Sequence, residues 1–183
     1  MIDKIGLIIL TMFGIGNIKY APGSVASFVT CLFFYVLANN ETIGDYGLFY
    51  SYDYFLIIFI IIFLIYSIIL IDKLSSHFKK KDPKEIVIDE FFGQLIPLIF
   101  IFYSGHYTIN TDLFFYPELR GPKLIWIFLA FILFRFFDIY KIFPINIVDK
   151  KMKNGLGIIL DDILAGIYAT ITIVILLKLL TWI

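Results

Sequence analysis

Long apolar runs, separated by short polar segments, form the main pattern of the chain. The clearest run covers residues 54–71 and contains no charged residue. Eighteen such residues predict a membrane-spanning helix. Four further runs, some shorter or interrupted by charge, lie at residues 24–38, 86–103, 123–140 and 158–182. Because a backbone in lipid must satisfy its hydrogen bonds internally, we expect an all-α, polytopic helical bundle with about five spans.

The N-terminal apolar segment differs from these runs. Residues 5–16 are apolar but too short to cross a bilayer, so we expect a short interfacial or re-entrant helix. Glycine and proline then interrupt the backbone between residues 14 and 23. Asp3 precedes the apolar stretch, and no small-residue cleavage site follows it, so we expect no cleaved signal peptide.

The composition agrees with a membrane protein. Of 183 residues, 61% are hydrophobic and 19% aromatic, and the mean hydropathy is +0.93. A soluble domain of this length could not bury so much apolar surface. We expect one membrane-embedded domain over residues 1–183. Cys31, the only cysteine, excludes an intrachain disulfide and a cysteine metal cluster, and we expect a buried thiol.

The positive charges predict the orientation of the spans. If the N-terminus is cytoplasmic and five spans alternate, twelve of the fifteen Lys and Arg residues lie on the inner side. Positive charge in short loops marks the cytoplasmic side, so we expect the N-terminus inside and the C-terminus outside. Four segments that combine charges with a span end then share the cytoplasmic face: residues 19–27, 82–93, 135–141 and 155–166.

Two pairs of adjacent acids stand near span ends on this face. Asp89-Glu90 and Asp161-Asp162 each follow three apolar residues, and a small residue comes about one turn later, at Gly93 and at Ala165-Gly166. Small residues allow helices to approach closely, which would bring the four carboxylates together. Such a cluster favours a hard divalent cation, and Mg²⁺ fits best. The alternative is that each pair only marks a helix N-terminus, where acids are favourable.

Basic residues on the same face are candidate phosphate ligands. Arg135, Asp138 and Lys141 lie at helical spacing near one span end. Arg135 and Lys141 could bind phosphate, although Arg135 could instead pair only with Asp138, and Lys141 could simply extend to the interface. The turn from Lys19 to Ser24 could add an anion site at a helix start. These groups together suggest phosphoryl chemistry on a lipid headgroup.

Four blocks of sequence carry a family resemblance. They are Ala21-Pro22-Gly23-Ser24, then Asp82-Pro83 through Ile86-Val87 with Asp89-Glu90 and Gly93, then Phe134-Arg135, Phe137-Asp138-Ile139 and Lys141, and last Gly157-Ile158 with Asp161-Asp162 and Ala165-Gly166. In this order they make the chain resemble the phosphatidylglycerophosphatase A family along nearly its whole length. The resemblance implies a Mg²⁺-dependent phosphatase that converts phosphatidylglycerophosphate to phosphatidylglycerol at the cytoplasmic face of a bacterial inner membrane. The departures from the family pattern remove no charged group, so we expect an active enzyme.

The expected site follows from these residues. We expect Asp89, Glu90, Asp161 and Asp162 to hold one or two Mg²⁺ ions, with a water made nucleophilic by the metal. An aspartate nucleophile is the second possibility. Asp138 is a further catalytic candidate, either at the metal or orienting Arg135. Phosphate ligands are expected to be Lys19, Ser24, Arg135 and Lys141, whereas Asp82 and Asp149 are expected to be structural.

Two other functions compete with a phosphatase. A small ion-coupled transporter or channel could use the carboxylates as a cation path, although no charge falls at the middle of a span. A scaffold subunit could carry acids that only affect insertion. The expected partner of a phosphatase is a phospholipid substrate in the membrane, and no nucleic acid.

Overall fold

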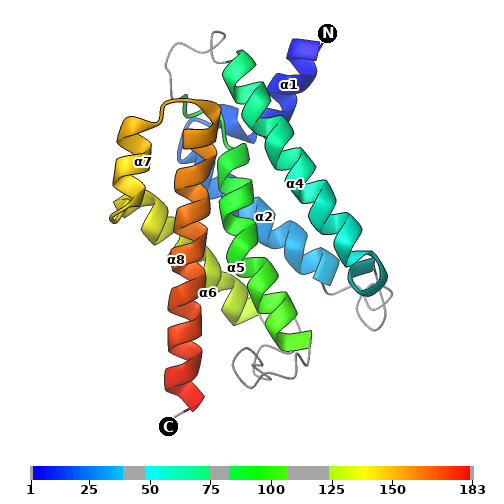
Figure 1. Ribbon diagram of the computed structural model, residues 1–183, viewed down its shortest axis with the longest axis vertical. Coiled ribbons are helices and arrows are strands. Elements are labelled where there is room, and N and C mark those ends of the chain that lie inside the picture. The colour runs from blue at the N-terminus through cyan, green and yellow to red at the C-terminus, as the bar shows by residue number, and fades with distance from the viewer. Residues whose placement is uncertain (1, 39–47, 75–82, 107–123, 182–183) are drawn as a thin grey trace.

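The computed structural model describes residues 2–38, 48–74, 83–106 and 124–181. All regular structure in these ranges is helical, which confirms the predicted all-α class (Figure 1). The helices are α1 (Ile2–Leu10), the 3-10 helix η1 (Ile15–Asn17), α2 (Pro22–Ala38), α4 (Leu48–Leu74), α5 (Ile88–His106), α6 (Leu124–Tyr140), α7 (Ile145–Lys151) and α8 (Gly155–Thr181).

Two predicted boundaries were wrong. Residues 141–157 were expected to form a loop, but they contain α7. The lysines of this segment favoured a loop, but α7 is a short amphipathic helix. Its Ile145 is fully buried and packs near Phe134 and Ala165. Likewise, α4 begins at Leu48 although residues 39–53 were expected to be a polar segment. Residues 48–53 contain no proline or glycine, so the helix extends past the apolar run.

The bundle is organised around α5, which packs against α2, α6 and α8. Its contact with α8 is the most extensive in the described structure, and the two helices lie side by side in Figure 1. Glycines make this approach possible. A Cβ atom on Gly93 would lie 2.6 Å from the carbonyl oxygen of Asp162, and one on Gly166 would collide with the carbonyl oxygen of Gly93. The predicted close approach of the two acid-bearing helices is therefore confirmed.

The segment before α5 is held by the N-terminal part of the chain. The backbone N–H of Val87 donates to the carbonyl oxygen of Leu10 at 3.0 Å. The backbone of Glu85 lies against Gly16, where a Cβ atom would overlap it. These contacts fix the residues that lead into α5, so the start of that helix is set by α1 and η1.

A second tertiary contact fixes the start of α8. The carboxylate of Asp72, near the end of α4, accepts a hydrogen bond of 2.6 Å from the backbone N–H of Gly155. The first N–H groups of a helix have no partner within it, so this carboxylate acts as a cap from another helix. The starts of α5 and α8 consequently lie at the same end of the bundle (Figure 1).

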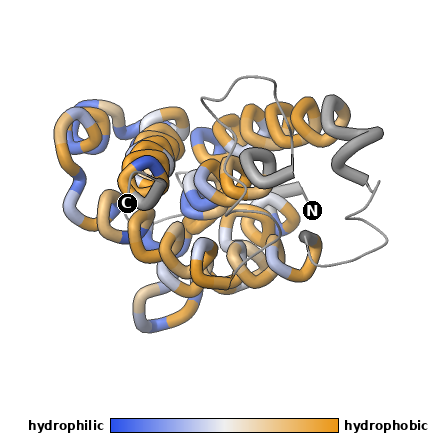
Figure 2. The backbone as a smooth tube through the Cα atoms, turned by 90° about the horizontal axis from the view of Figure 1, so that it is seen from below, coloured by the Kyte–Doolittle hydropathy of each residue, from blue (hydrophilic) through white to orange (hydrophobic). Residues whose placement is uncertain are grey.

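Within the part of the chain that the structure describes, two helices are long and apolar enough to cross a membrane. They are residues Phe55–Leu74 in α4 and Gly155–Leu179 in α8. Nine of the twenty side chains of the α4 segment are exposed large apolar groups, such as Phe59 and Ile62, and hydrophobic residues predominate along the helices in Figure 2. The other three predicted spans contain helices, but the number of spans stays a prediction.

Candidate active site

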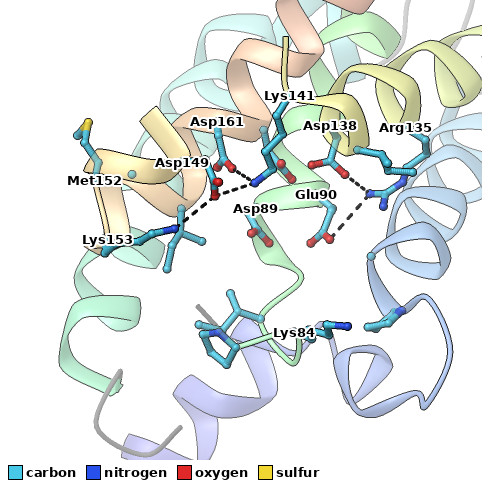
Figure 3. A pocket seen from close by; sticks show the side chains of 18 of the residues that line it. Lys84, Asp89, Glu90, Arg135, Asp138, Lys141, Asp149, Met152, Lys153 and Asp161 are labelled. Carbon is cyan, nitrogen blue, oxygen red and sulfur yellow. Dashed lines mark hydrogen bonds and ion pairs between the residues drawn. The ribbon is translucent and has the colours of Figure 1, made fainter. Parts of the chain in front are cut away.

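A polar cavity of about 360 Å³ lies at the end of the bundle where α5 and α8 begin (Figure 3). Its walls come from four separate parts of the chain: residues 21–23, 83–90, 135–141 and 149–162. The sequence predicted that four charged segments would share one face, and the structure brings residues from all four into one cavity. The two acid pairs and the Arg135–Lys141 segment contribute the charged groups.

Three carboxylates converge in this cavity. Asp89, Glu90 and Asp162 each offer one oxygen atom, and the three atoms lie within 4.8 Å of one another. We call these residues the acid triad. Among the described residues, Asp89 Oδ1, Glu90 Oε2 and Asp162 Oδ2 are buried without a hydrogen-bond partner. Buried carboxylate oxygens need a compensating partner, and hard oxygen donors at this spacing suit Mg²⁺. The residues present therefore fit the expected metal.

Asp161 pairs with a lysine, whereas its neighbour Asp162 belongs to the acid triad. Lys141 Nζ donates to Asp161 Oδ2 at 2.7 Å and to Asp149 Oδ1 at 2.8 Å. Adjacent residues on a helix point about 100° apart, so one member of the pair faces the triad and the other faces Lys141. The structure places Asp161 outside the acid triad, and its predicted role as a metal ligand is untested.

Lys141 lies in the turn between α6 and α7, and its two partners lie in α7 (Asp149) and in α8 (Asp161). Burial disfavours the charge of Lys141, but the hydrogen bonds to Asp149 and Asp161 outweigh this effect and raise the pKa of the ammonium above its ordinary value. For Asp149, partial burial is outweighed by Lys141 and Lys153, which lower the pKa of the carboxyl. Lys141 is thus held in its charged form at the cavity wall.

Arg135 links two acids at the other side of the cavity. Its Nη1 lies 2.8 Å from Asp138 Oδ2 and 3.9 Å from Glu90 Oε1. The Nε atom is buried and has no hydrogen-bond partner among the described residues. Asp138 therefore orients the guanidinium, which keeps donor capacity for an anionic ligand. In the view of Figure 3, Glu90 and Asp138 lie between the Arg135 and Lys141 side chains.

The start of α2 contacts the acid triad directly. Gly23 lies so close to Glu90 that a Cβ atom would overlap the carboxylate oxygen. The partial positive charge of a helix N-terminus is favourable beside an acid. Two residues predicted from this turn are placed elsewhere. Lys19 is exposed with its ammonium 5.4 Å from the centroid of the Tyr20 ring, and neither Lys19 nor Ser24 lines the cavity.

Some cavity residues were not predicted from the sequence. Lys84 and Lys153 add two cations to the wall, and Asp149, expected to be structural, lines the cavity as well. The spacing of Asp149 and Lys153, four residues apart, is the one signal that could have indicated their 3.5 Å ion pair. Gln94, one turn after Glu90, is fully buried with no hydrogen-bond partner for its amide among the described residues. Asp82, also expected to be structural, lies outside the described residues.

Comparison with known proteins decides the family. The family model for phosphatidylglycerophosphatase A matches residues 8–177. The chain belongs to the phosphatidylglycerophosphatase A family. Its members are lipid phosphomonoesterases, so the chain is an enzyme, and the alternatives of a transporter or a scaffold are set aside.

Three relatives are similar over most of their length. The chain is 35% identical to phosphatidylglycerophosphatase A of Haemophilus influenzae, over 88% of this chain and 82% of the relative. It is 29% identical to a putative phosphatidylinositol-3-phosphatase of Bacteroides thetaiotaomicron, over 91% and 90%. It is 24% identical to phosphatidylglycerophosphatase A of Escherichia coli, over 85% and 73%. No solved structure matches this chain.

Proposed function

We propose that this enzyme removes the terminal phosphate of phosphatidylglycerophosphate in a Mg²⁺-dependent reaction at the cytoplasmic face of a bacterial inner membrane. The observation that carries the proposal is the joint presence, in one cavity, of three unpartnered carboxylate oxygens and the Arg135 guanidinium. The first group suits a divalent cation and the second suits a phosphate. The family membership supplies the reaction class.

The acid triad would hold the metal. Asp89, Glu90 and Asp162 provide its protein ligands, and Asp161 remains a candidate for an additional one. A bound Mg²⁺ supplies charge stabilisation for the phosphomonoester and a lower pKa for a coordinated water. The close contact of α5 with α8 at Gly93 and Gly166 keeps the triad at short range, because either helix would have to move for the oxygens to separate.

Two cations would bind and neutralise the substrate phosphate. Arg135 is oriented by Asp138 and faces the cavity from α6, and its planar fork can bind two phosphate oxygens at once. Lys141 faces the same cavity with its charge secured by Asp149 and Asp161. Donors fixed in advance around the position where negative charge develops lower the barrier to phosphoryl transfer. Asp138 acts in this scheme as a positioning residue.

The nucleophile is assigned to water. All three acids of the triad are committed to the metal in this scheme, and Asp161 and Asp138 each have a cation as partner at 2.7 and 2.8 Å. The competing route makes an aspartate the nucleophile and passes through a phosphoaspartate. The stereochemical outcome at phosphorus, followed with a substrate whose terminal phosphate is made chiral with oxygen isotopes and sulfur, separates the two. A single in-line attack by water inverts the configuration at phosphorus, whereas two successive in-line displacements through a phosphoaspartate retain it.

A second substrate is supported by one relative. The Bacteroides protein carries the name of a putative phosphatidylinositol-3-phosphatase, and the similarity covers nearly all of both chains. Both lipids present a phosphomonoester on a polyol headgroup, so the same acids and cations could act on either. Phosphatidylglycerophosphate remains the first choice because two phosphatidylglycerophosphatases and the family model match the chain.

The membrane arrangement completes the proposal. We infer five spans with the N-terminus and the cavity on the cytoplasmic side. This arrangement is supported by the inward bias of positive charge and by the position of the cavity at one end of the bundle. A lipid substrate can then reach the cavity by lateral diffusion, with its headgroup at the level of the charged residues.

Phosphate release by the purified protein in detergent tests the function. The assay compares phosphatidylglycerophosphate with phosphatidylinositol 3-phosphate, each with Mg²⁺ and with EDTA. We expect Mg²⁺-dependent release from phosphatidylglycerophosphate at the higher kcat/KM. A higher kcat/KM for the inositol lipid would reassign the substrate. Phosphate release that persists in EDTA would contradict the proposed requirement for Mg²⁺.

A further inference from the structure

A second cavity, almost entirely apolar, lies between α2 and α6. Its volume is about 170 Å³, and it is lined by Phe28, Cys31, Leu32 and Tyr35 of α2 and by four apolar residues of α6 between Leu124 and Phe131. We call it the α2–α6 groove. Both helices also contribute to the polar cavity, through Gly23 of α2 and Arg135 of α6. Helices α2 and α6 therefore each form part of the wall of both cavities.

The groove starts close to the polar cavity along both helices. Phe28 is five residues beyond Gly23, about 7.5 Å of helix rise, and Phe131 is four residues before Arg135, about 6 Å. The Phe28 and Phe131 rings meet edge to face, with their centroids 6.2 Å apart. This ring pair marks the boundary at which the wall changes from charged to apolar.

The length of the path matches a lipid tail. From Gly23 to Tyr35 the helix rises about 18 Å, close to the ~15 Å thickness of the hydrocarbon layer of one leaflet. A headgroup whose phosphate lies beside Arg135 would place its first tail carbons at the Phe28–Phe131 pair. We propose that the α2–α6 groove holds one acyl chain of the lipid phosphomonoester while its phosphate occupies the polar cavity. This inference rests on the proposed function.

The other apolar groove of this region fits the role less well. It lies between α6 and α8, has a volume of about 550 Å³, and is lined by residues that include Ile132, Leu176 and Leu179. On α8 its first lining residue, Leu176, is fourteen residues beyond Asp162, which is about 21 Å of helix rise. Its α8 wall is therefore remote from the acids, whereas both walls of the α2–α6 groove begin near the polar cavity.

A pair of matched substitutions tests the inference. Leu32 lines the α2–α6 groove and Ile132 lines the α6–α8 groove. Their exposed fractions are 53% and 45%, and the two side chains are isomers. Leu32→Trp and Ile132→Trp therefore add the same volume to different grooves. Each variant is assayed with phosphatidylglycerophosphate carrying two oleoyl chains and with the same lipid carrying two hexanoyl chains.

We expect Leu32→Trp to lower kcat/KM for the dioleoyl lipid by about tenfold, mainly through KM, because a filled apolar pocket discriminates by this order. The dihexanoyl lipid, which needs little of the groove, should keep its kcat/KM. Ile132→Trp should change neither value. Equal losses of Leu32→Trp on both lipids, an effect of Ile132→Trp as large as that of Leu32→Trp, or no loss at all would overturn the inference.

A binding readout makes the test independent of turnover and of the folding of the variants. Wild-type protein in EDTA is irradiated with dioleoyl-length phosphatidylglycerophosphate that carries a diazirine in one acyl chain. Crosslinks to peptides 22–38 and 124–140 are expected, and crosslinks confined to α4 or α8 would reject the groove. Failure of the proposed function would instead appear as wild-type protein that hydrolyses neither lipid, whatever the crosslinking pattern.

Discussion

The two acid pairs have nearly the same sequence context but different surroundings. Asp89 and Glu90 both belong to the acid triad, whereas only Asp162 of the second pair does. Asp161 instead accepts a hydrogen bond of 2.7 Å from Lys141. Glu90 also has a cation nearby, but Arg135 Nη1 is 3.9 Å away and is closer to Asp138. The Asp161 carboxylate is thus neutralised by a close partner, while the Glu90 carboxylate remains available for a metal.

Position within the helix explains this difference. Asp89 and Glu90 occupy the first turn of α5, where the N-terminus of α2 approaches Glu90 through Gly23. Asp161 and Asp162 lie in the second turn of α8, between α5 on one side and the Lys141 turn on the other. Since successive side chains diverge by about 100°, the neighbouring elements decide which acid enters the triad. Similar motifs can therefore supply different chemical groups.

The largest effect on activity is expected when the two members of the second acid pair are replaced one at a time. Asp162→Asn removes a carboxylate of the triad whose Oδ2 has no hydrogen-bond partner among the described residues. It should lower kcat by more than about 100-fold, since even outer partners of a metal ligand are worth about 10–100-fold. Asp161→Asn weakens the Lys141 contact and should fall within that smaller range. Phosphate release under saturating Mg²⁺ measures both variants. If Asp161→Asn were the more damaging change, the assignment of the triad would be wrong.

Replacing the cation nearest the first pair should give the next largest effect. Arg135→Lys keeps the charge but loses the planar fork that pairs with Asp138 and that, in the proposed scheme, binds the substrate phosphate. Loss of a hydrogen bond to a charged group costs about 1.5–3 kcal/mol, so kcat/KM should fall by about 10–100-fold. Steady-state kinetics on folded protein measure the change. Wild-type kcat/KM in Arg135→Lys would show that any positive charge is sufficient at this position.

Moving the two pairs apart should mainly affect stability. In Gly166→Ala the new methyl group collides with the backbone of Gly93, so α5 and α8 must separate. Overpacking of this kind costs about 1–3 kcal/mol. The matched control is Ile167→Ala on the neighbouring, more exposed position, which should change stability by no more than about 0.5 kcal/mol. Thermal unfolding in detergent compares them, and equal midpoints would mean that the close approach is not required.

The smallest effect is expected at the edge of the second pair. Asp149→Asn removes a partly exposed ion pair with Lys141 and Lys153, which is worth about 0–1 kcal/mol. Because the folded pKa of Asp149 is lowered, its charge stabilises the fold above the unfolded pKa of about 3.9, and this contribution is lost as pH falls through the folded pKa. The stability difference from wild type should therefore be present at pH 7 and disappear in acid. A stability difference that grows as the pH falls would contradict the predicted direction of the effect.

The sequence predicted the helices and the face on which the charged segments meet, because apolar runs and small residues determine both. The Gly93–Gly166 approach followed from residue size alone. The sequence could not predict α7, a helix of seven residues in which only Ile145 is buried. Nor could it predict that Lys141 would take Asp161, because that contact depends on the turn after α6, where Lys141 has a φ of 43°. Contacts between loops and helices lie outside what hydrophobic periodicity encodes.

The same limit applies to the phosphate ligands. Arg135 and Lys141 were expected from their spacing on one helix end, and both line the cavity. Lys19 and Ser24 were expected from a glycine-containing turn, yet residues 21–23 of that turn line the cavity instead. The direction of the chain through residues 19–23, including a φ of 47° at Ala21, decides which groups face inward. Residue type alone does not specify this direction.

Metal binding tests the central claim most directly, since it asks whether the acid triad holds an ion whatever the substrate. Mn²⁺, an oxygen-preferring ion with an EPR signal, can stand in for Mg²⁺. Titration of purified wild type, Asp162→Asn and Asp161→Asn, with Mg²⁺ as competitor, would follow the free Mn²⁺ signal. The account predicts a site in wild type that Mg²⁺ displaces, that is lost in Asp162→Asn and that is retained in Asp161→Asn. Unchanged binding in folded Asp162→Asn would contradict it.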